Sequence, residues 1–133
     1  MSKVELLCKC ENLLGEGITY SSLEENLFWL DISSKSKLYK LELSSNKTEV
    51  FSLPEIVTAT SIKSKNEIIL ASNNGINLFD LKTKSFEKKI GIEDNIFHTR
   101  SNDGASDSLG RFWFGTMQNN FDENSIINVL LSL

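Results

Sequence analysis

The chain has 133 residues, of which 40% are apolar, and this is enough to bury the core of one domain. Its net charge of -4 excludes the basic surface that binds phosphate backbones, so nucleic acid is not an expected partner. No apolar run reaches the roughly 20 residues that cross a bilayer, and the N-terminus lacks the apolar core of a secretory signal. We therefore expect a cytoplasmic protein that makes no membrane contact.

Two cysteines come first along the chain. Cys8 and Cys10 are two residues apart, a spacing that places both side chains on one side of an extended segment. A tetrahedral metal site would need further cysteine or histidine ligands, and the sequence offers neither a second cysteine pair nor a histidine cluster. We interpret the two as free, reduced thiols without an assigned reaction.

The next feature is a carboxylate between two glycines, Gly15-Glu16-Gly17, just before an expected strand. Glycine can adopt positive φ and lets the backbone approach a ligand closely, so Glu16 would project from a tight turn toward a cation. An ordinary surface turn with a solvated glutamate explains the same residues, and this stretch alone leaves both readings open.

Short segments rich in β-branched, leucine and aromatic residues follow, separated by turns of Asn, Ser, Lys and Gly. This pattern predicts an all-β fold, because few stretches carry the apolar period of a helix. The predicted strands are Leu27 to Ile32, Leu38 to Leu43, Thr48 to Leu53, Ala59 to Ile62, Ile68 to Ser72, Gly75 to Asp80, Ser85 to Ile90 and Arg111 to Thr116.

Part of this pattern repeats. The strand pair at Leu27 to Asp31 and Leu38 to Leu41 is echoed at Glu67 to Ala71 and Leu78 to Leu81, and a third aromatic strand begins near Phe112. A repeat of about 40 to 45 residues built from short strands is typical of β-propeller blades. A plain β-meander with regular turns is the alternative.

The last stretch with candidate chemistry is His98 to Met117, expected to be a loop that leads into an aromatic strand. It holds Arg100, Asn102 and Asp103, and such oxygen-bearing and guanidinium side chains suit a hard cation and a carbonyl-rich ligand. Asn-Asp-Gly is also an ordinary turn sequence, so a structural role remains open. His98, the only histidine, is interpreted as structural or solvent-exposed.

Four motifs occur in a shared order and spacing between about Leu14 and Met117. They are Gly15-Glu16-Gly17, the strand Phe28-Trp29-Leu30-Asp31-Ile32, Arg100-Ser101-Asn102-Asp103-Gly104, and Gly110-Arg111-Phe112-Trp113-Phe114-Gly115-Thr116-Met117. In these motifs the sequence resembles the gluconolactonase/regucalcin family.

The resemblance implies a six-bladed propeller with one divalent metal, calcium or zinc, in its central channel. It implies that Glu16 is a metal ligand, that Arg100 and Asn102 bind the substrate, and that Asp103 shapes the loop. The implied reaction is hydrolysis of a sugar lactone, in which the metal polarises the carbonyl and activates water. Ile18 and Ala105 replace the proline and lysine usual in the family, so the identity of the lactone stays open.

Residues 1 to 133 would supply only two to three blades of a single propeller domain, and these cannot close a ring. Family members complete the site with an asparagine ligand and an aspartate that is both ligand and general base, on later blades, so we predict no catalytic residue in this chain. We expect a truncation within the apolar run Ile126 to Leu133, an inactive chain, and self-association through an exposed blade edge. A non-catalytic propeller that serves as a binding module, or a truncated product without function, are the alternatives.

Overall fold

A computed structural model describes residues 3–119 and 130–132 of the chain. All of its regular structure in this part is β, which confirms the predicted fold class. No helix among the described residues has the length and apolarity needed to span a membrane. The strands are β1 (Gly15–Ser21), β2 (Asn26–Asp31), β3 (Lys37–Glu42), β4 (Lys47–Ser52), β5 (Val57–Ile62), β6 (Glu67–Ser72), β7 (Gly75–Asp80), β8 (Phe86–Ile90), β9 (Thr99–Ser106), β10 (Phe112–Gln118) and β11 (Leu130–Ser132).

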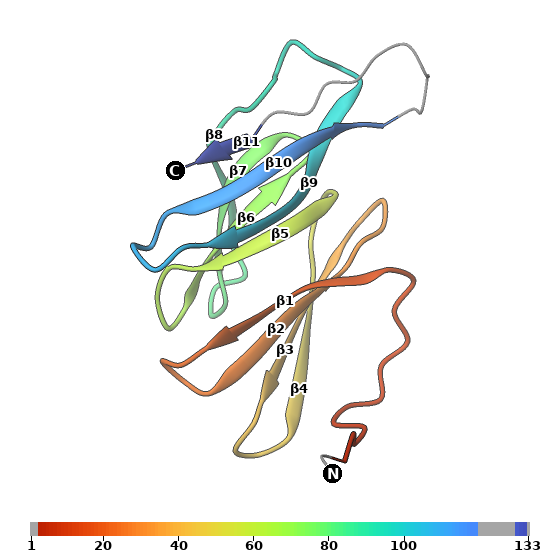
Figure 1. Cartoon of the computed structure of the whole chain (residues 1–133), viewed down its shortest axis with the longest axis vertical. Coiled ribbons are helices and arrows are strands. Elements are labelled where there is room, and N and C mark those ends of the chain that lie inside the picture. The colour runs from red at the N-terminus through yellow and green to blue at the C-terminus, as the bar shows by residue number, and fades with distance from the viewer. Residues whose placement is uncertain (1–2, 120–129, 133) are drawn as a thin grey trace.

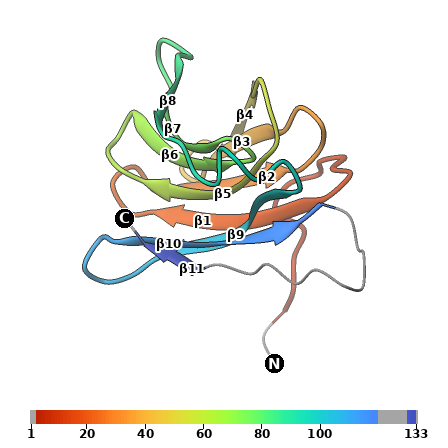
Figure 2. The same ribbon diagram turned by 90° about the horizontal axis from the view of Figure 1, so that it is seen from above.

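These strands form three antiparallel sheets in which every strand pairs with its neighbour in sequence. Strands β1 to β4 make the first sheet, β5 to β8 the second, and β9 to β11 the third. The sheets are layered against one another rather than joined into one continuous sheet (Figure 1 and Figure 2). Two four-stranded meanders followed by the start of a third agree with the two to three propeller blades predicted from the repeat.

Side-chain alternation explains why the strands pack as they do. In β2, Phe28 and Leu30 are buried, whereas Trp29 between them lies on the opposite face. Trp29 is the cross-strand partner of Tyr39 on β3, and their rings stack with centroids 5.1 Å apart. The first sheet therefore presents one face to the second sheet and a stacked aromatic pair on the other.

Two apolar layers hold the three sheets together. The larger layer lies between the first and second sheets and comprises Phe28, Leu30, Leu38, Phe51, Leu53, Val57, Ile68, Leu70 and Phe79. The smaller lies between the second and third sheets and comprises Ala59, Ala71, Ile76, Phe112 and Phe114. Because the second sheet is covered on both faces, it is the central layer of the described structure.

The turn between β6 and β7 requires glycine. Gly75 has φ of 125°, and a Cβ atom there would lie 2.1 Å from the carbonyl oxygen of Ile90. Asn73-Asn74-Gly75 was predicted as a turn, and this close approach of β8 is the physical reason that its last residue has no side chain.

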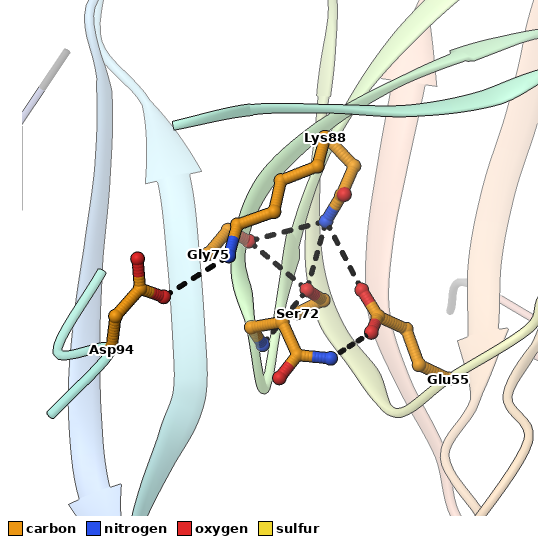
Figure 3. A network of polar contacts seen from close by, with 7 residues as sticks. Glu55, Ser72, Gly75, Lys88 and Asp94 are labelled. Atoms are coloured by element: carbon orange, nitrogen blue, oxygen red, sulfur yellow. Dashed lines mark hydrogen bonds and ion pairs between the residues drawn. The ribbon is translucent and has the colours of Figure 1, made fainter. Parts of the chain in front are cut away.

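A polar network fastens the same turn to the segment before β5 (Figure 3). Asn77, which is 1% exposed, donates from Nδ2 to the Ser72 hydroxyl at 2.8 Å and to Glu55 at 3.4 Å. Asn74 also donates to the Glu55 carboxylate. Nearby, Lys88 on β8 pairs with Asp94 at 3.0 Å. The network satisfies the buried Nδ2 of Asn77, whereas the Oδ1 of the same side chain has no hydrogen-bond partner among the described residues.

Three strands, β1, β9 and β11, were not among those predicted. The expected tight turn at Gly15-Glu16-Gly17 is instead the first part of β1, and the expected loop after His98 is instead β9. The first segment holds two glycines and the second holds Ser, Asn, Asp and Gly, and pairing with β2 and β10 sets their extended conformation. The run Ile126 to Leu133 lies mostly outside the described residues.

Candidate functional site

The first strands of the three sheets, β1, β5 and β9, lie side by side, with β5 between the other two (Figure 1). Hydroxyl groups bridge them at matched positions. Thr19 on β1 meets Thr60 on β5 at 3.2 Å, and Thr58 on β5 donates to Ser101 on β9 at 2.7 Å. Ser61 and Ser106 meet at 2.6 Å further along. Since residue numbers rise together across these bridges, the three strands run parallel.

This register places the candidate residues at one end of the three strands. Gly17 lies beside Thr58, whose carbonyl oxygen is 3.7 Å from the position of a Gly17 Cβ, and Thr58 in turn bonds Ser101. Glu16 and Arg100 directly precede Gly17 and Ser101, and each is the second residue of its strand. The Glu16 carboxylate and the Arg100 guanidinium therefore start from equivalent positions near the first residues of the parallel strands β1 and β9.

Glu16 is exposed, and a buried carboxylate fixes the backbone that carries it. Asp31, which is 3% exposed, accepts hydrogen bonds from the amides of Leu13 at 2.8 Å and Leu14 at 3.0 Å. Gly17 has φ of 65°, and the pairing of β1 with β2 shifts register between Glu16 and Thr19. A bulge next to a functional carboxylate is a recurrent way to aim a side chain out of a sheet.

Glu16 lines a cavity of about 410 Å³ between β1 and the segment that precedes it. Cys8, Cys10, Asn12 and Trp29 line the same cavity. Glu5 adds a second carboxylate, and most of the other lining side chains are apolar.

Arg100 and Asn102 lie on β9, and their surroundings differ from those of Glu16 on β1. Arg100 is half-buried, pairs with Met117 on β10, and donates from Nη1 to the carbonyl of Ser101 at 2.8 Å. Asn102 is exposed. Asp103 is also exposed, and its Oδ1 accepts a hydrogen bond from the amide of Gly104 at 2.7 Å.

Glu16 and Arg100, two of the three predicted site residues, line different cavities, and Asn102 lines neither of these two. Glu16 lines the 410 Å³ cavity, Arg100 lines a small cavity of about 10 Å³, and Asp103 lines a separate cavity of about 580 Å³ together with Gly17 and Thr60. Strand β5 separates Glu16 from the β9 residues. Among residues 3–119 and 130–132, no group of three or more His, Cys, Asp and Glu side chains could hold a metal ion. The described residues therefore form no closed metal site of such side chains among themselves.

Two polar residues beside Arg100 were missed by sequence reasoning. Glu93 accepts from Thr116 at 3.1 Å through Oε1, while its Oε2 is buried without a hydrogen-bond partner among the described residues. The buried Oδ1 of Asn73 lacks a described partner as well, and both residues line the small cavity with Arg100. No motif marks either residue. The one available signal is the acidic character of Glu93, which precedes Arg100 in the connection between β8 and β9.

Asp107 organises the turn between β9 and β10. Its Oδ2 accepts from the Trp113 indole at 2.9 Å and from Arg111 Nε at 2.6 Å, and its Oδ1 accepts from the amides of Leu109 and Arg111. The bond from Trp113, followed by those from Arg111 and the turn amides, holds the pKa of Asp107 well below its usual range, although partial desolvation opposes the shift. The Arg111 guanidinium also lies over the Trp113 ring, 5.4 Å from its centroid.

Comparison with known proteins gives a consistent result. Residues 14–133 match the family model described as "SMP-30/Gluconolactonase/LRE-like region". The chain is 31% identical over 113 residues to 6-deoxy-6-sulfogluconolactonase of Pseudomonas putida, with 85% of this chain and 38% of that protein aligned. It is 28% identical over 111 residues to L-arabinolactonase of Azospirillum brasilense, which covers 83% of this chain and 36% of the relative.

Among solved structures, regucalcin of Agrobacterium tumefaciens, described as a calcium-binding protein, superposes with a TM-score of 0.84 at 28% identity. The superposition covers 96% of this chain and 42% of regucalcin. The chain thus spans less than half the length of the relatives it matches.

Proposed function

The chain belongs to the SMP-30/gluconolactonase/LRE-like family, and on that basis we propose that it forms part of a metal-dependent site that hydrolyses sugar lactones. Glu16 supplies one metal ligand, and Arg100 with Asn102 binds the lactone. The observation that carries this proposal is the matched position of Glu16 and Arg100. Each is the second residue of its strand, and the two strands, β1 and β9, run parallel. A metal ligand and a substrate-binding group on one level can face a common channel.

The described residues fit a divalent cation in part. Glu16 offers an exposed hard oxygen, which suits calcium and is also accepted by zinc. Because the described ranges hold no group of three or more His, Cys, Asp and Glu side chains for a metal, further ligands would have to be amide, hydroxyl or backbone oxygens or come from residues outside these ranges. When bound, such a cation would polarise the lactone carbonyl and lower the pKa of an attacking water.

The described residues have distinct tasks in this proposal. Asp31 fixes the backbone before Glu16 and thereby orients the carboxylate. Arg100 donates one N–H to the Ser101 carbonyl, and the other donors of its planar guanidinium can bind substrate oxygens. Asn102 adds an exposed amide on the same strand. These groups bind and orient a polyhydroxylated lactone, and the general base lies elsewhere.

The class of substrate rests on the relatives. 6-Deoxy-6-sulfogluconolactonase and L-arabinolactonase carry a sugar lactone in their names, and both align with more than four fifths of this chain. We propose a sugar lactone for this chain too, without a choice between a hexose and a pentose derivative.

Calorimetric titration of the chain with Ca²⁺ and with Zn²⁺ tests the proposal directly. Glu16→Gln removes the charged ligand while keeping the size of the side chain, and Glu11→Gln, also exposed but outside β1, is the matched control. We expect binding by the wild type and by Glu11→Gln, and its loss in Glu16→Gln. Equal binding by all three proteins would contradict the assignment of Glu16.

The substrate half of the site is tested separately with a non-hydrolysable lactone analogue, such as a sugar lactam, in the presence of the cation. Arg100→Lys preserves the charge but not the planar fork of donors, so we expect weaker binding of the analogue with unchanged binding of the cation. Equal affinity of wild type and variant for the analogue would remove Arg100 from the proposed site.

A further inference from the structure

Cys8 and Cys10 lie in the segment before β1, and the proposed function gives them no role. Both are free, and both line the 410 Å³ cavity that Trp29 also lines. Cys8 is half-buried, with its Sγ 3.5 Å from the Thr48 hydroxyl, while Cys10 is exposed. Two thiols on one side of one cavity are a potential redox centre, which a lone cysteine is not.

The side chain of Asn12 connects this thiol pair to the first sheet. Its Oδ1 accepts a hydrogen bond from Cys10 Sγ at 3.2 Å and another from the Trp29 indole nitrogen at 3.2 Å. The position of a Cβ on Gly15 would lie 3.4 Å from Asn12 Cβ, so Asn12 also packs against the first residue of β1. A change at the Cys10 sulfur is thus two hydrogen bonds away from Trp29.

We propose that Cys8 and Cys10 form a thiol–disulfide pair whose oxidation is transmitted through Asn12 to Trp29 and the start of β1. A low-molecular-weight disulfide such as glutathione disulfide is the oxidant. One thiolate attacks it to form a mixed disulfide and release one glutathione, and the second thiolate then displaces the other glutathione. The pair loses two protons and two electrons, and the oxidant is reduced to two molecules of glutathione.

The local backbone allows this closure without disrupting a sheet. Residues 3–12 belong to none of the described strands, so bending them breaks no ladder hydrogen bond. Backbone amides of this segment bond the first sheet only after residue 12, where the Leu13 and Leu14 amides donate to Asp31. A disulfide needs its two Cα atoms within about 7 Å of each other, a separation that a bent two-residue spacing reaches.

Oxidation also changes the hydrogen bonding of Asn12. A disulfide sulfur has no hydrogen to donate, so Asn12 Oδ1 loses the bond from Cys10 and keeps only the bond from Trp29. Partial desolvation raises the pKa of the Cys10 thiol, and the neighbouring Cys8 sulfur raises it further. Cys10 therefore stays mostly protonated at neutral pH, and its reaction with the oxidant should accelerate as the pH rises.

Mass spectrometry of the chain after incubation in glutathione redox buffers tests the chemistry. We expect the loss of two hydrogen atoms from one peptide that contains both cysteines, reversed by dithiothreitol. Cys8→Ser and Cys10→Ser should each abolish this change. A stable glutathione adduct on one cysteine, a disulfide-linked dimer, or no reaction over a range of pH would overturn the pair.

Fluorescence tests the transmission. In Trp113→Phe, Trp29 is the only remaining tryptophan, and a nearby disulfide quenches indole emission, so we expect a loss of emission on oxidation. Cys8→Ser in this background should show no loss, and Asn12→Ala should show a smaller one. Equal Trp29 emission in the reduced and oxidised protein would overturn the transmission to Trp29. Neither experiment involves a lactone or a divalent cation, so failure here is separate from failure of the proposed function.

Discussion

Asp107 and Trp113 are joined across the turn between β9 and β10 by a 2.9 Å hydrogen bond from the indole nitrogen to the carboxylate. The same carboxylate also accepts from Arg111 and from two turn amides. A single acidic side chain thereby fixes both the turn and the aromatic strand that follows it.

This arrangement predicts a pH dependence of stability. The pKa of Asp107 is lowered in the folded chain, so its contribution is fully present above the unfolded carboxyl pKa of about 3.9 and is lost as the pH falls through the folded value. Asp107→Asn should unfold at lower urea than wild type at pH 7, and the difference should shrink in acid. Asp94→Asn, which alters an exposed ion pair, is the control. A difference that stays constant down to pH 2 would contradict this role.

The hydroxyl bridge between Thr58 and Ser101 should couple the second and third sheets. Both residues are buried, and Thr58 donates to Ser101 at 2.7 Å. A double-mutant cycle with Thr58→Val and Ser101→Ala should yield a coupling of about 1 kcal/mol in the free energy of unfolding, as for a buried neutral hydrogen bond. Thr83→Val with Ser101→Ala pairs an exposed residue with the same partner, and its effects should be additive. Additive effects in the first cycle would mean that the bridge contributes nothing.

The buried Asp31 carboxylate should protect the amides of Leu13 and Leu14 from hydrogen exchange. Asp31→Ala leaves these donors without their acceptor, which should cost on the order of 1–3 kcal/mol and speed their exchange. Asp31→Asn keeps an oxygen acceptor and should have the smaller effect. Exchange rates measured by NMR that are equal in wild type and Asp31→Ala would show that the segment is held by other contacts.

The free face of β1 should drive association of the chain. Ile18 is 72% exposed and Tyr20 is 54% exposed, and both alternate with Thr19, which faces β5. Sedimentation velocity should reveal oligomers that Tyr20→Lys reduces, because exposed apolar side chains favour burial against another surface. Leu109→Lys, at a residue 76% exposed in a turn, should leave association unchanged. A wild type that sediments as a monomer at all concentrations would contradict the predicted self-association.

The strands with clear apolar alternation could be predicted from sequence. Leu27 to Ile32 and Gly75 to Asp80 fall within one residue of β2 and β7, because their side chains alternate between a buried layer and the other face. Strands β1 and β9 could not be predicted from sequence, because Gly15-Glu16-Gly17 and Ser101-Asn102-Asp103-Gly104 favour turns locally. Their strand conformation depends on partners distant in sequence.

For the candidate site, too, some features could be predicted from the sequence and others could not. Glu16, Arg100 and Asn102 were identified from their motifs, but their placement depends on how β1, β5 and β9 align, which is a property of three packed sheets. Glu93 was missed because its place beside Thr116 and Arg100 depends on how the connection between β8 and β9 packs, which no local motif indicates.

The intervening strand β5 has a bearing on how this family can diversify. Glu16 and Arg100 share a level but are separated by a whole strand, so neither side chain must adjust when the other is replaced. Under the proposed roles, substitutions that change metal affinity at Glu16 should leave the binding of the substrate at Arg100 intact, and the two properties could be optimised in separate rounds of selection.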